Sequence, residues 1–556
     1  MSHSMFEKHE KTLKGALEAI KSRTYWTPYP EIPSGKIYGE SAKADGLAAF
    51  EGRLNQPFEL NQPGTGRTQR SEVSPYGMSL GITYPKPDLD ELIPAMQSAM
   101  QGWKSASIEA RVGVCLEILD RLSKNAFEMA SAIMHTTGQT FMMAFQAGGP
   151  HALDRGLEAV AYAYQEMTRC PRQVVWEKQV SKTDVVRLQK TYRILPRGVA
   201  ALIGCSTFPT WNGYPGLFAS LVTGNAVAVK PHHGAILPMA LTVNIARAVL
   251  AEADFDPNII TLVPNSLDGE SISKDLVTHP GVGIVDYTGG TEFGDWLEAN
   301  CPQAQVFTEK AGVNSIVLDS VDDLKAVTGN IAFSVSLYSG QMCTAPQNIF
   351  IPKGGIRVGG DTISFDDAAQ AVVKGVNWLL SDQKRAVEVL GAIQSESTVR
   401  RMTEAAAEGG EVLRSSEPVP HDKFPEARIH SPVIIKVSGD QTDLYMREVF
   451  GPVVYIVETE STAQSIELAA RTAREQGAIT SLVYSTDDDV LRESQDALTD
   501  AGVPVSCNLI GPIFVNQAAA FSDFHVSGAN PAGNATLCDA AFVANRFRTV
   551  HTRVLL

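Results

Sequence analysis

The sequence predicts an α/β protein built around a parallel β-sheet. Short apolar runs alternate with amphipathic, helix-like segments such as 237–253 through the middle of the chain, and a second series of the same kind spans 366–500. This alternation favours right-handed βαβ units, the usual platform for a dinucleotide. The expected strands are 199–204, 226–230, 259–263, 283–288 and 315–320, then 433–437, 453–457 and 479–485.

Composition bounds the class of protein. The 556 residues correspond to about three or four domain-sized units. Hydrophobic residues make up 44% and charged residues 20%, which is ordinary for a soluble globular chain and excludes a disordered or collagen-like one. The net charge of −15 and the lack of a long basic run argue against nucleic acid or a membrane surface as a partner.

The seven cysteines indicate reduced thiols. None forms a C-x-x-C pair, so we expect no metal site and no thioredoxin-like motif. An odd number of cysteines in a long chain fits a reducing compartment. The first twenty residues are charged and lack the apolar region of a signal peptide. These observations predict a cytoplasmic protein.

The ends of the chain differ from its middle. Residues 1–75 are rich in turns, with one expected helix near 5–22, and are predicted to wrap over a domain surface. Apolar residues recur at helical spacing over 89–169. Residues 174–196 alternate around a polar turn and predict a β-hairpin. The tail at 513–556 is expected to be extended.

Two long stretches carry no charge, at 198–229 and 326–352. Each contains proline and glycine, which would leave backbone groups unsatisfied in a bilayer. We therefore interpret both as buried strand–loop–helix crossings, where a dry active site could be built.

Cys343 is a candidate nucleophile because it lies in one of these uncharged loops, next to glycine. Glu309 lies upstream at the end of an expected strand, where a carboxylate can act as a general base for water. Each residue alone has a simpler interpretation: a core cysteine and a solvated loop glutamate.

Five segments in order resemble the signatures of the aldehyde dehydrogenase superfamily, and the resemblance covers roughly residues 75–550. In chain order they are V-K-P at 229–231, Y-T-G-G-T-E-F-G at 287–294, E-x-x-G at 309–312, G-Q-x-C at 340–343 and E-x-F-G-P-V at 448–453. The resemblance implies a Rossmann-type cofactor domain and an α/β catalytic domain, with Cys343 as nucleophile and Glu309 as base.

The same resemblance implies a nicotinamide cofactor. Lys230 would contact the adenosine ribose or its phosphate, and the helix opening at Gly290 and Thr291 would face the pyrophosphate. The segment containing Glu448 and Phe450 would lie at the nicotinamide ribose, with the glutamate accepting from its hydroxyls.

His233 stands where many NAD-preferring members of the superfamily carry a glutamate. Without that carboxylate, no negative charge at this position repels the 2′-phosphate of NADP. We therefore expect NADP as the preferred cofactor, with NAD as the alternative. Alternatively, two exposed histidines at the start of a helix have no effect on whether a 2′-phosphate binds.

One position departs from the superfamily pattern. The asparagine that usually donates to the oxyanion is replaced by Thr207. A threonine hydroxyl can donate one hydrogen bond, but it is shorter. Asn212, five residues later, is the alternative donor.

The long N-terminus, the loop at 205–213 and the turn at 230–234 resemble the stand-alone phenylacetate-degradation dehydrogenases of the PaaN branch. The expected reaction is oxidation of an aldehyde to an acid through a cysteine thioacyl intermediate. The substrate would be a semialdehyde of aromatic degradation, free or CoA-linked. Alternatives are a CoA-acylating enzyme and a non-catalytic member acting in assembly; Glu309 favours water as the acceptor.

By resemblance, the cofactor-binding domain comprises 1–178 and 200–309, and the catalytic domain comprises 310–512. The hairpin at 179–199 and the tail at 513–556 form an oligomerisation arm. An isolated hairpin is marginal in water and leaves its edges unpaired. Pairing between subunits would cover them, so we expect a homodimer or homotetramer.

Overall fold

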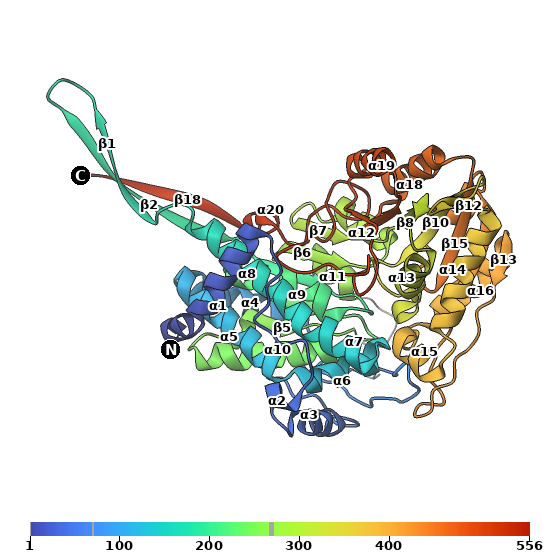
Figure 1. Cartoon of the computed structure of the whole chain (residues 1–556). Helices are drawn as coiled ribbons and strands as arrows, with labels where there is room; N and C mark the ends of the chain where they lie inside the picture. The colour runs from blue at the N-terminus through green and yellow to red at the C-terminus, as the bar shows by residue number, and fades with distance from the viewer. Residues whose placement is uncertain (1, 69–71, 266–271) are drawn as a thin grey trace.

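The computed structural model describes residues 2–68, 72–265 and 272–556 (Figure 1). Its first sheet has five parallel strands in the order β5-β4-β3-β6-β7. This sheet confirms the predicted parallel α/β class. The strands are β3 (Val199–Ile203), β4 (Ala226–Lys230), β5 (Ile260–Leu262), β6 (Val282–Thr288) and β7 (Gln305–Glu309).

Helices cover both faces of the first sheet because the strands are apolar on both sides. Val199 and Ala201 of β3 pack with one set of helices, whereas Ala200 and Leu202 pack with the other, as the two-residue period of a strand requires. The first set is α4 (Leu89–Ser105), α11 (Ile272–Thr278) and α12 (Thr291–Asn300). The second includes α9 (Pro209–Val222) and α10 (Leu237–Glu252).

Further helices surround the second face, and the predicted helical stretch at 89–169 is confirmed. Besides α4, the stretch at 89–169 contains α5 (Ile108–Lys124), α6 (Ala126–Thr137), α7 (Phe141–Gln146), the π-helical turn η1 (Ala147–His151) and α8 (Ala152–Thr168).

A second sheet of seven strands has the order β13-β14-β15-β10-β8-β16-β17. Only its edge strand β13 is antiparallel to its neighbour. The strands are β8 (Asn314–Leu318), β10 (Pro346–Pro352), β13 (Glu411–Arg414), β14 (Val433–Ser438), β15 (Val453–Thr459), β16 (Ser481–Tyr484) and β17 (Val505–Cys507).

Two layers of helices cover the second sheet. One face carries α13 (Leu324–Ser336) and α14 (Phe365–Leu379), and the other carries α16 (Glu396–Glu408), α18 (Thr462–Gln476) and α19 (Asp488–Asp500). The shorter helices α15 (Gln383–Leu390) and α17 (Thr442–Tyr445) lie in connections. A small sheet joins β9 (Ser320–Val321), β11 (Ile356–Val358) and β12 (Asp361–Ile363).

The N-terminal region is more helical than the sequence predicts. The expected first helix is α1 (Ser2–Ser22), but α2 (Gly35–Tyr38) and α3 (Ala42–Glu51) occupy part of the stretch expected to be irregular. Gly46 lets α3 approach α6 closely, since a Cβ there would lie 2.4 Å from the Cβ of Phe127. A short helix rich in alanine and glycine carries no apolar periodicity, so the pattern missed it.

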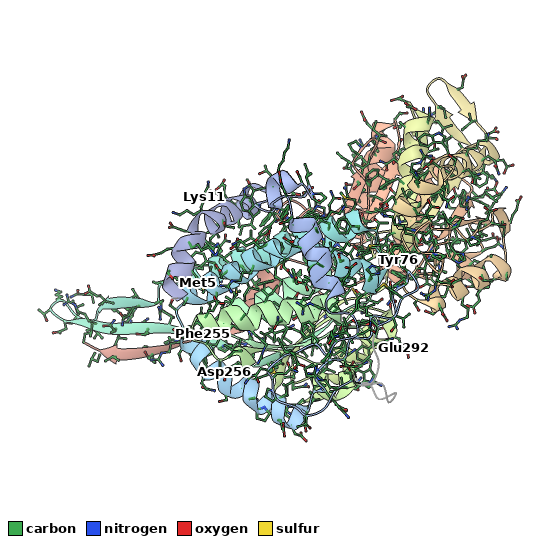
Figure 2. The ribbon with its side chains drawn as sticks, turned by 90° about the horizontal axis from the view of Figure 1, so that it is seen from below. Met5, Lys11, Tyr76, Phe255, Asp256 and Glu292 are labelled. Carbon is green, nitrogen blue, oxygen red and sulfur yellow. The ribbon has the colours of Figure 1, made fainter. Side chains whose placement is uncertain are left out.

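The predicted hairpin is confirmed as β1 (Gln173–Gln179) and β2 (Val185–Pro196). The last strand, β18 (Phe547–Leu555), pairs antiparallel with β2. Figures 1 and 2 show this three-stranded arm projecting from the rest of the molecule. Before β18, the tail runs back over the body as loops and the short helix α20 (Ala540–Ala544).

The two uncharged stretches are buried crossings, as predicted. The first forms β3, α9 and β4, and the second forms most of α13, the turn η3 (Leu337–Gly340) and β10. Among the described helices, none combines the length and the apolar character needed to cross a bilayer.

Candidate active site

Cys343 follows a tightly wound turn. Tyr338, Ser339 and Gly340 all have positive φ, at 52°, 50° and 62°, a conformation that side chains other than glycine rarely adopt. A Cβ on Gly340 would lie 2.4 Å from the carbonyl oxygen of Gly451. The turn therefore brings the 340–343 segment against the 448–453 segment.

Asn314 fixes the loop that carries Cys343. Its Nδ2 donates to the carbonyl oxygens of Cys343 at 2.8 Å and Ala345 at 3.0 Å. Its Oδ1 accepts from the backbone N–H groups of Ile479 at 2.9 Å and Thr480 at 3.1 Å. One buried amide thus ties the loop to the two residues that precede β16, which holds the thiol in place.

Glu309 is the last residue of β7 and is 1% exposed. Asn212 Nδ2 donates to its Oε2 at 2.7 Å, and His525 Nε2 lies 2.8 Å from its Oε1. Both carboxylate oxygens are therefore held by nitrogen, one from α9 and one from the C-terminal tail.

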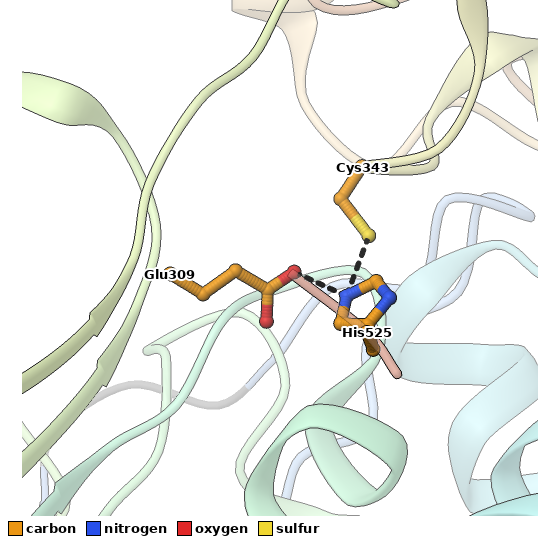
Figure 3. A group of neighbouring side chains, drawn as sticks. All are labelled: Glu309, Cys343 and His525. Atoms are coloured by element: carbon orange, nitrogen blue, oxygen red, sulfur yellow. Dashed lines mark hydrogen bonds and ion pairs between the residues drawn. The ribbon is translucent and has the colours of Figure 1, made fainter. Parts of the chain in front are cut away.

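His525 completes the cluster. Its Nε2 lies 3.6 Å from Cys343 Sγ as well as 2.8 Å from Glu309. Figure 3 shows the three side chains converging from separate segments. The imidazole meets the Trp211 ring edge-on at a centroid distance of 4.6 Å, and its Nδ1 finds no hydrogen-bond partner within the described part of the chain.

The charges of the cluster follow from burial and proximity. Burial is the largest influence on Glu309 and raises its pKa, but His525, Cys343 and Asn212 outweigh it and leave the pKa below its usual value. Burial, and then the negative charge of Glu309, raise the pKa of the Cys343 thiol well above its usual value. At neutral pH the resting site therefore holds a carboxylate and a neutral thiol.

Thr207 and Asn212 have different surroundings. The Thr207 hydroxyl contacts the sulfur of Cys205, while its carbonyl oxygen accepts from Gln139 Nε2 at 2.8 Å. Asn212 reaches Glu309 directly, and its Oδ1 lies 3.6 Å from Cys205 Sγ. Asn212, not Thr207, is the amide that the structure places beside Glu309.

The edge of the first sheet offers sites for a dinucleotide. Lys230 ends β4 and is 6% exposed, and burial lowers its pKa to about 8. Gly290 precedes α12, and an added Cβ would meet nothing within 4 Å. With Thr291 it presents the N-terminus of α12, where backbone N–H groups favour an anion such as a pyrophosphate.

His233 is exposed and its ring lies 4.1 Å from that of His232. The two histidines follow Lys230 directly, at the start of the turn that leads to α10. Burial lowers the pKa of His232 to about 3, so this ring is neutral at neutral pH. Neither ring brings a carboxylate to this edge.

Glu448 lies against the segment that follows Glu309. The backbone N–H of Gly312 donates to its carboxylate, and burial raises its pKa to about 7. Two residues later, the carbonyl oxygen of Phe450 accepts from the guanidinium of Arg401. The contact between Gly312 and Glu448 brings the 448–453 and 309–312 segments together.

The same cluster has donors suited to a metal ion. The Sγ of Cys343, a ring nitrogen of His525 and a carboxylate oxygen of Glu309 all lie within 4.8 Å of one another. Thiolate, imidazole and carboxylate are the ligands that zinc prefers.

The parallel sheet, the open N-terminus of α12 and the pairing of a half-buried cysteine with a buried carboxylate define an α/β nucleotide-dependent oxidoreductase. The aldehyde dehydrogenase family model matches residues 82–538, and the chain belongs to this family. It is an aldehyde dehydrogenase that uses NAD or NADP to oxidise a small-molecule aldehyde.

Solved structures support this assignment. The NAD-dependent aldehyde dehydrogenase from Burkholderia multivorans is 54% identical, with a TM-score of 0.98 over 100% of both chains. The 1-pyrroline-5-carboxylate dehydrogenase from Thermus with bound NAD has a TM-score of 0.73 at 17% identity, covering 96% of this chain and 99% of that one; this likeness shows the fold.

Relatives identified by sequence are more distant. N-succinylglutamate 5-semialdehyde dehydrogenase of Burkholderia cenocepacia (strain HI2424) is 26% identical over 398 residues, which cover 69% of this chain and 74% of that protein. Aldehyde dehydrogenase LUC3 of Fusarium sp is 24% identical over 431 residues, covering 77% of this chain and 82% of that protein. Semialdehyde dehydrogenases are therefore among the relatives.

Two site residues escaped the sequence analysis. Asn314 lies only five positions after Glu309, and an asparagine entering an apolar strand was the signal that could have found it. His525 lies in a loop-rich tail with no recognisable pattern, so only the tertiary structure reveals it.

Proposed function

We propose that this enzyme oxidises its aldehyde to a free carboxylic acid through a thioester on Cys343, with Glu309 as the base that activates water. The observation that best supports this proposal is that Cys343 Sγ and Glu309 Oε1 contact the same nitrogen, His525 Nε2. A carboxylate this close to the nucleophile can reach a water that attacks a cysteine thioester.

The steps use groups in the site. The Cys343 thiolate attacks the aldehyde carbon, and the backbone N–H of Cys343 stabilises the oxyanion. Asn212 Nδ2 has two hydrogens, of which Glu309 needs one, so the second can reach the oxyanion. Thr207 is the lesser candidate, since its hydroxyl contacts Cys205. The nicotinamide, when bound, supplies the hydride acceptor. Glu309 then takes a proton from water, which releases the acid.

The cofactor contacts are part of the proposal. Lys230 and His233 would face the adenosine ribose, and Gly290 and Thr291 the pyrophosphate. The segment of Glu448 and Phe450 would approach the nicotinamide ribose. Because His233 stands where a carboxylate would repel a 2′-phosphate, NADP should bind at least as tightly as NAD.

For the substrate, we propose a semialdehyde of phenylacetate or another aromatic degradation route, free or CoA-linked. The resemblance of the 205–213 and 230–234 segments to that branch supports it. Cys343 also packs beside Ile479, Val526 and Ala532, and Trp211 lies behind His525. Such walls suit an uncharged carbon chain or ring next to the reacting carbonyl.

The domain boundaries, the arm and the location remain proposals of the same kind. The cofactor-binding and catalytic domains would meet near 309–310, and the arm would join two or four subunits. Exposed apolar side chains on β1, β2 and β18, including Val175, Leu195 and Val554, support subunit pairing there. The seven unpaired cysteines fit a cytoplasmic protein.

The test measures cofactor reduction with a panel of free aromatic, free aliphatic and CoA-linked aldehydes, each with and without added CoA. We expect free acid as product and a rate that does not depend on CoA. A thioester product that forms only when CoA is added would contradict the proposal. It would show that the acyl group passes from Cys343 to CoA instead of to water. Cys343→Ala should reduce cofactor only at background rate, whereas Cys170→Ala, at an exposed cysteine, should keep full activity.

A further inference from the structure

His525 is held in place although it lies in the loop-rich C-terminal tail. Its backbone exchanges hydrogen bonds with Leu537 at 2.8 and 3.1 Å, and its side chain is 1% exposed. The imidazole meets the Trp211 ring edge-on. The guanidinium of Arg155 lies over the same indole, 5.1 Å from the ring centroid, and donates to the carbonyl oxygen of Leu537 at 3.4 Å. Contacts to the backbone and to the ring therefore fix the direction of Nε2.

The backbone turns sharply directly after His525. Val526 has a φ of 59°, in the left-handed region that a β-branched residue adopts only when its surroundings impose it. Its side chain is 1% exposed and packs in the small apolar cluster beside Cys343. Backbone strain of this kind is concentrated at functional sites. The turn therefore marks the position of His525 as one that the fold enforces.

The neighbours of His525 assign the hydrogen of its ring. Nε2 lies 2.8 Å from Glu309 Oε1 and 3.6 Å from Cys343 Sγ (Figure 3). Nδ1 contacts no acceptor in the described part of the chain. Because the carboxylate is charged and is the nearer of the two partners, the Nε2–H bond donates to Glu309. The ring is thus a fixed donor, which neither gains nor loses a proton during the reaction.

The Glu309 carboxylate keeps room for water while it is held. A carboxylate has about four acceptor positions, two on each oxygen. In the resting site Asn212 donates to it at 2.7 Å and His525 at 2.8 Å, and the Cys343 thiol donates as well. Formation of the thioester removes the thiol hydrogen but leaves both nitrogen donors. The carboxylate is then fixed from two sides and can still accept from a water.

We propose that His525 is a positioning residue for the second half of the reaction, whose Nε2–H holds Glu309 beside the acyl group on Cys343 so that it meets the attacking water. This inference rests on the proposed function, in which Glu309 activates water. A misplacement of about 1 Å can cost about 10²-fold in rate. Trp211 and Asn212 are adjacent on α9. One helix therefore holds Glu309 twice, directly through Asn212 and indirectly through the ring that contacts Trp211.

p-Nitrophenyl acetate tests this role in the full-length enzyme, without aldehyde or cofactor. The Cys343 sulfur displaces p-nitrophenol from the ester and becomes acetylated. Water then splits the acetyl thioester into acetate and the free thiol. Release of p-nitrophenol in the first turnover measures acetylation. Rapid quenching and peptide mass spectrometry measure the loss of the acetyl group from Cys343, which is the step that uses Glu309.

His525→Leu removes the donor with little change in size. We expect hydrolysis of the acetyl thioester to become about 10²-fold slower, whereas acetylation of Cys343 stays close to the wild-type rate. His525→Gln places an amide N–H near the position of Nε2 and should restore most of the lost rate. A loss of stability alone would neither separate the two steps nor be reversed by glutamine.

The matched control is His135→Leu, which alters a histidine buried elsewhere, stacked on Phe50, and both steps should proceed as in the wild type. If His525→Leu does not fold, as judged by circular dichroism, His525→Asn decides, because its shorter amide does not reach Glu309 and should slow hydrolysis in the same way.

Three results would overturn the inference: wild-type hydrolysis in the folded variant that lacks the donor, equal slowing of both steps, or no recovery in His525→Gln. A wild-type protein that carries no acetyl group on Cys343 would overturn the proposed function, and this inference with it. The two failures are therefore distinguishable, because only the second removes the acetylation of Cys343.

Discussion

Glu309 Oε1 and His525 Nε2 lie 2.8 Å apart, although 216 residues separate them in the sequence. The pair joins the end of β7 to the C-terminal tail. The tail therefore has two parts: residues up to about Arg546 lie against the body, and β18 alone extends into the arm. Arg546 closes the first part with a bidentate ion pair to Asp286 of β6, at 2.6 and 2.7 Å.

Replacing Glu309 by glutamine should separate the two halves of the reaction. Glutamine keeps the size of the side chain but cannot take a proton from water, so the thioester should accumulate. Rapid mixing should show an initial burst of reduced cofactor, followed by a steady rate about 10²–10⁴-fold below wild type. Glu298→Gln is the control, because Glu298 contacts Thr308 and Lys310 rather than the cluster. Wild-type steady turnover in Glu309→Gln would place the base elsewhere.

Asn314→Asp should loosen the loop of Cys343 while keeping its link to β16. The aspartate can still accept from Ile479 and Thr480, but it cannot donate to the carbonyl oxygens of Cys343 and Ala345. Each lost bond leaves a half-buried carbonyl without this donor, so the free energy of unfolding should fall by about 1–3 kcal/mol. Urea unfolding measures this change. A fall in kcat larger than that in Asn530→Asp, which alters another asparagine bonded to the backbone, would show that the loop position matters to catalysis.

The raised pKa of Glu448 predicts that the free energy of unfolding depends on pH. Burial raises its pKa to about 7, above its value in the unfolded chain, so the folded protein loses stability as the pH rises from about 4.5 to 7. At pH 8 the free energy of unfolding of Glu448→Gln should therefore exceed that of the wild type by about 3 kcal/mol. The difference should vanish at pH 4.5. Denaturant titrations at the two pH values check it, and a constant difference would contradict it.

The position of His233 predicts that a substitution there changes the preference between NADP and NAD. His233→Glu introduces a carboxylate three residues after Lys230, which should repel a 2′-phosphate and accept from the 2′-hydroxyl of NAD. The ratio of the Kd values for NADP and NAD should rise about tenfold or more, by roughly 1.4 kcal/mol of discrimination. Fluorescence titration measures both constants, with His233→Gln as the uncharged control. A clear NAD preference in the wild-type protein would contradict the NADP expectation.

The arm predicts association. Light scattering at micromolar concentration should give two or four times the chain mass of 59.9 kDa. Val175→Lys, at an exposed apolar position of β1, should shift the species toward the monomer because a buried ammonium is costly. Val412→Lys, at a similarly exposed position on β13, should not. A monodisperse wild-type monomer would contradict this prediction.

The sequence predicted the parallel strands and the central helices because their signals are local. Apolar runs with alternating helices are visible within windows of a dozen residues, and β3, β4, β5, β6 and β8 follow them closely. The exceptions are elements without such periodicity. Helix α3 depends on Gly46 meeting α6, and that contact is invisible in the chain order.

The sequence alone also indicated the family and predicted roles for Cys343 and Glu309, since these residues lie in short segments whose order and letters are distinctive. Only the tertiary structure decided what surrounds them. Folding brings Asn212 to Glu309, turns Thr207 toward Cys205 and places His525 between the thiol and the carboxylate. The contacts of Asn212 and His525 join segments that lie 97 to 216 residues apart. They depend on tertiary packing, and a local sequence pattern does not show which distant side chains will share one site.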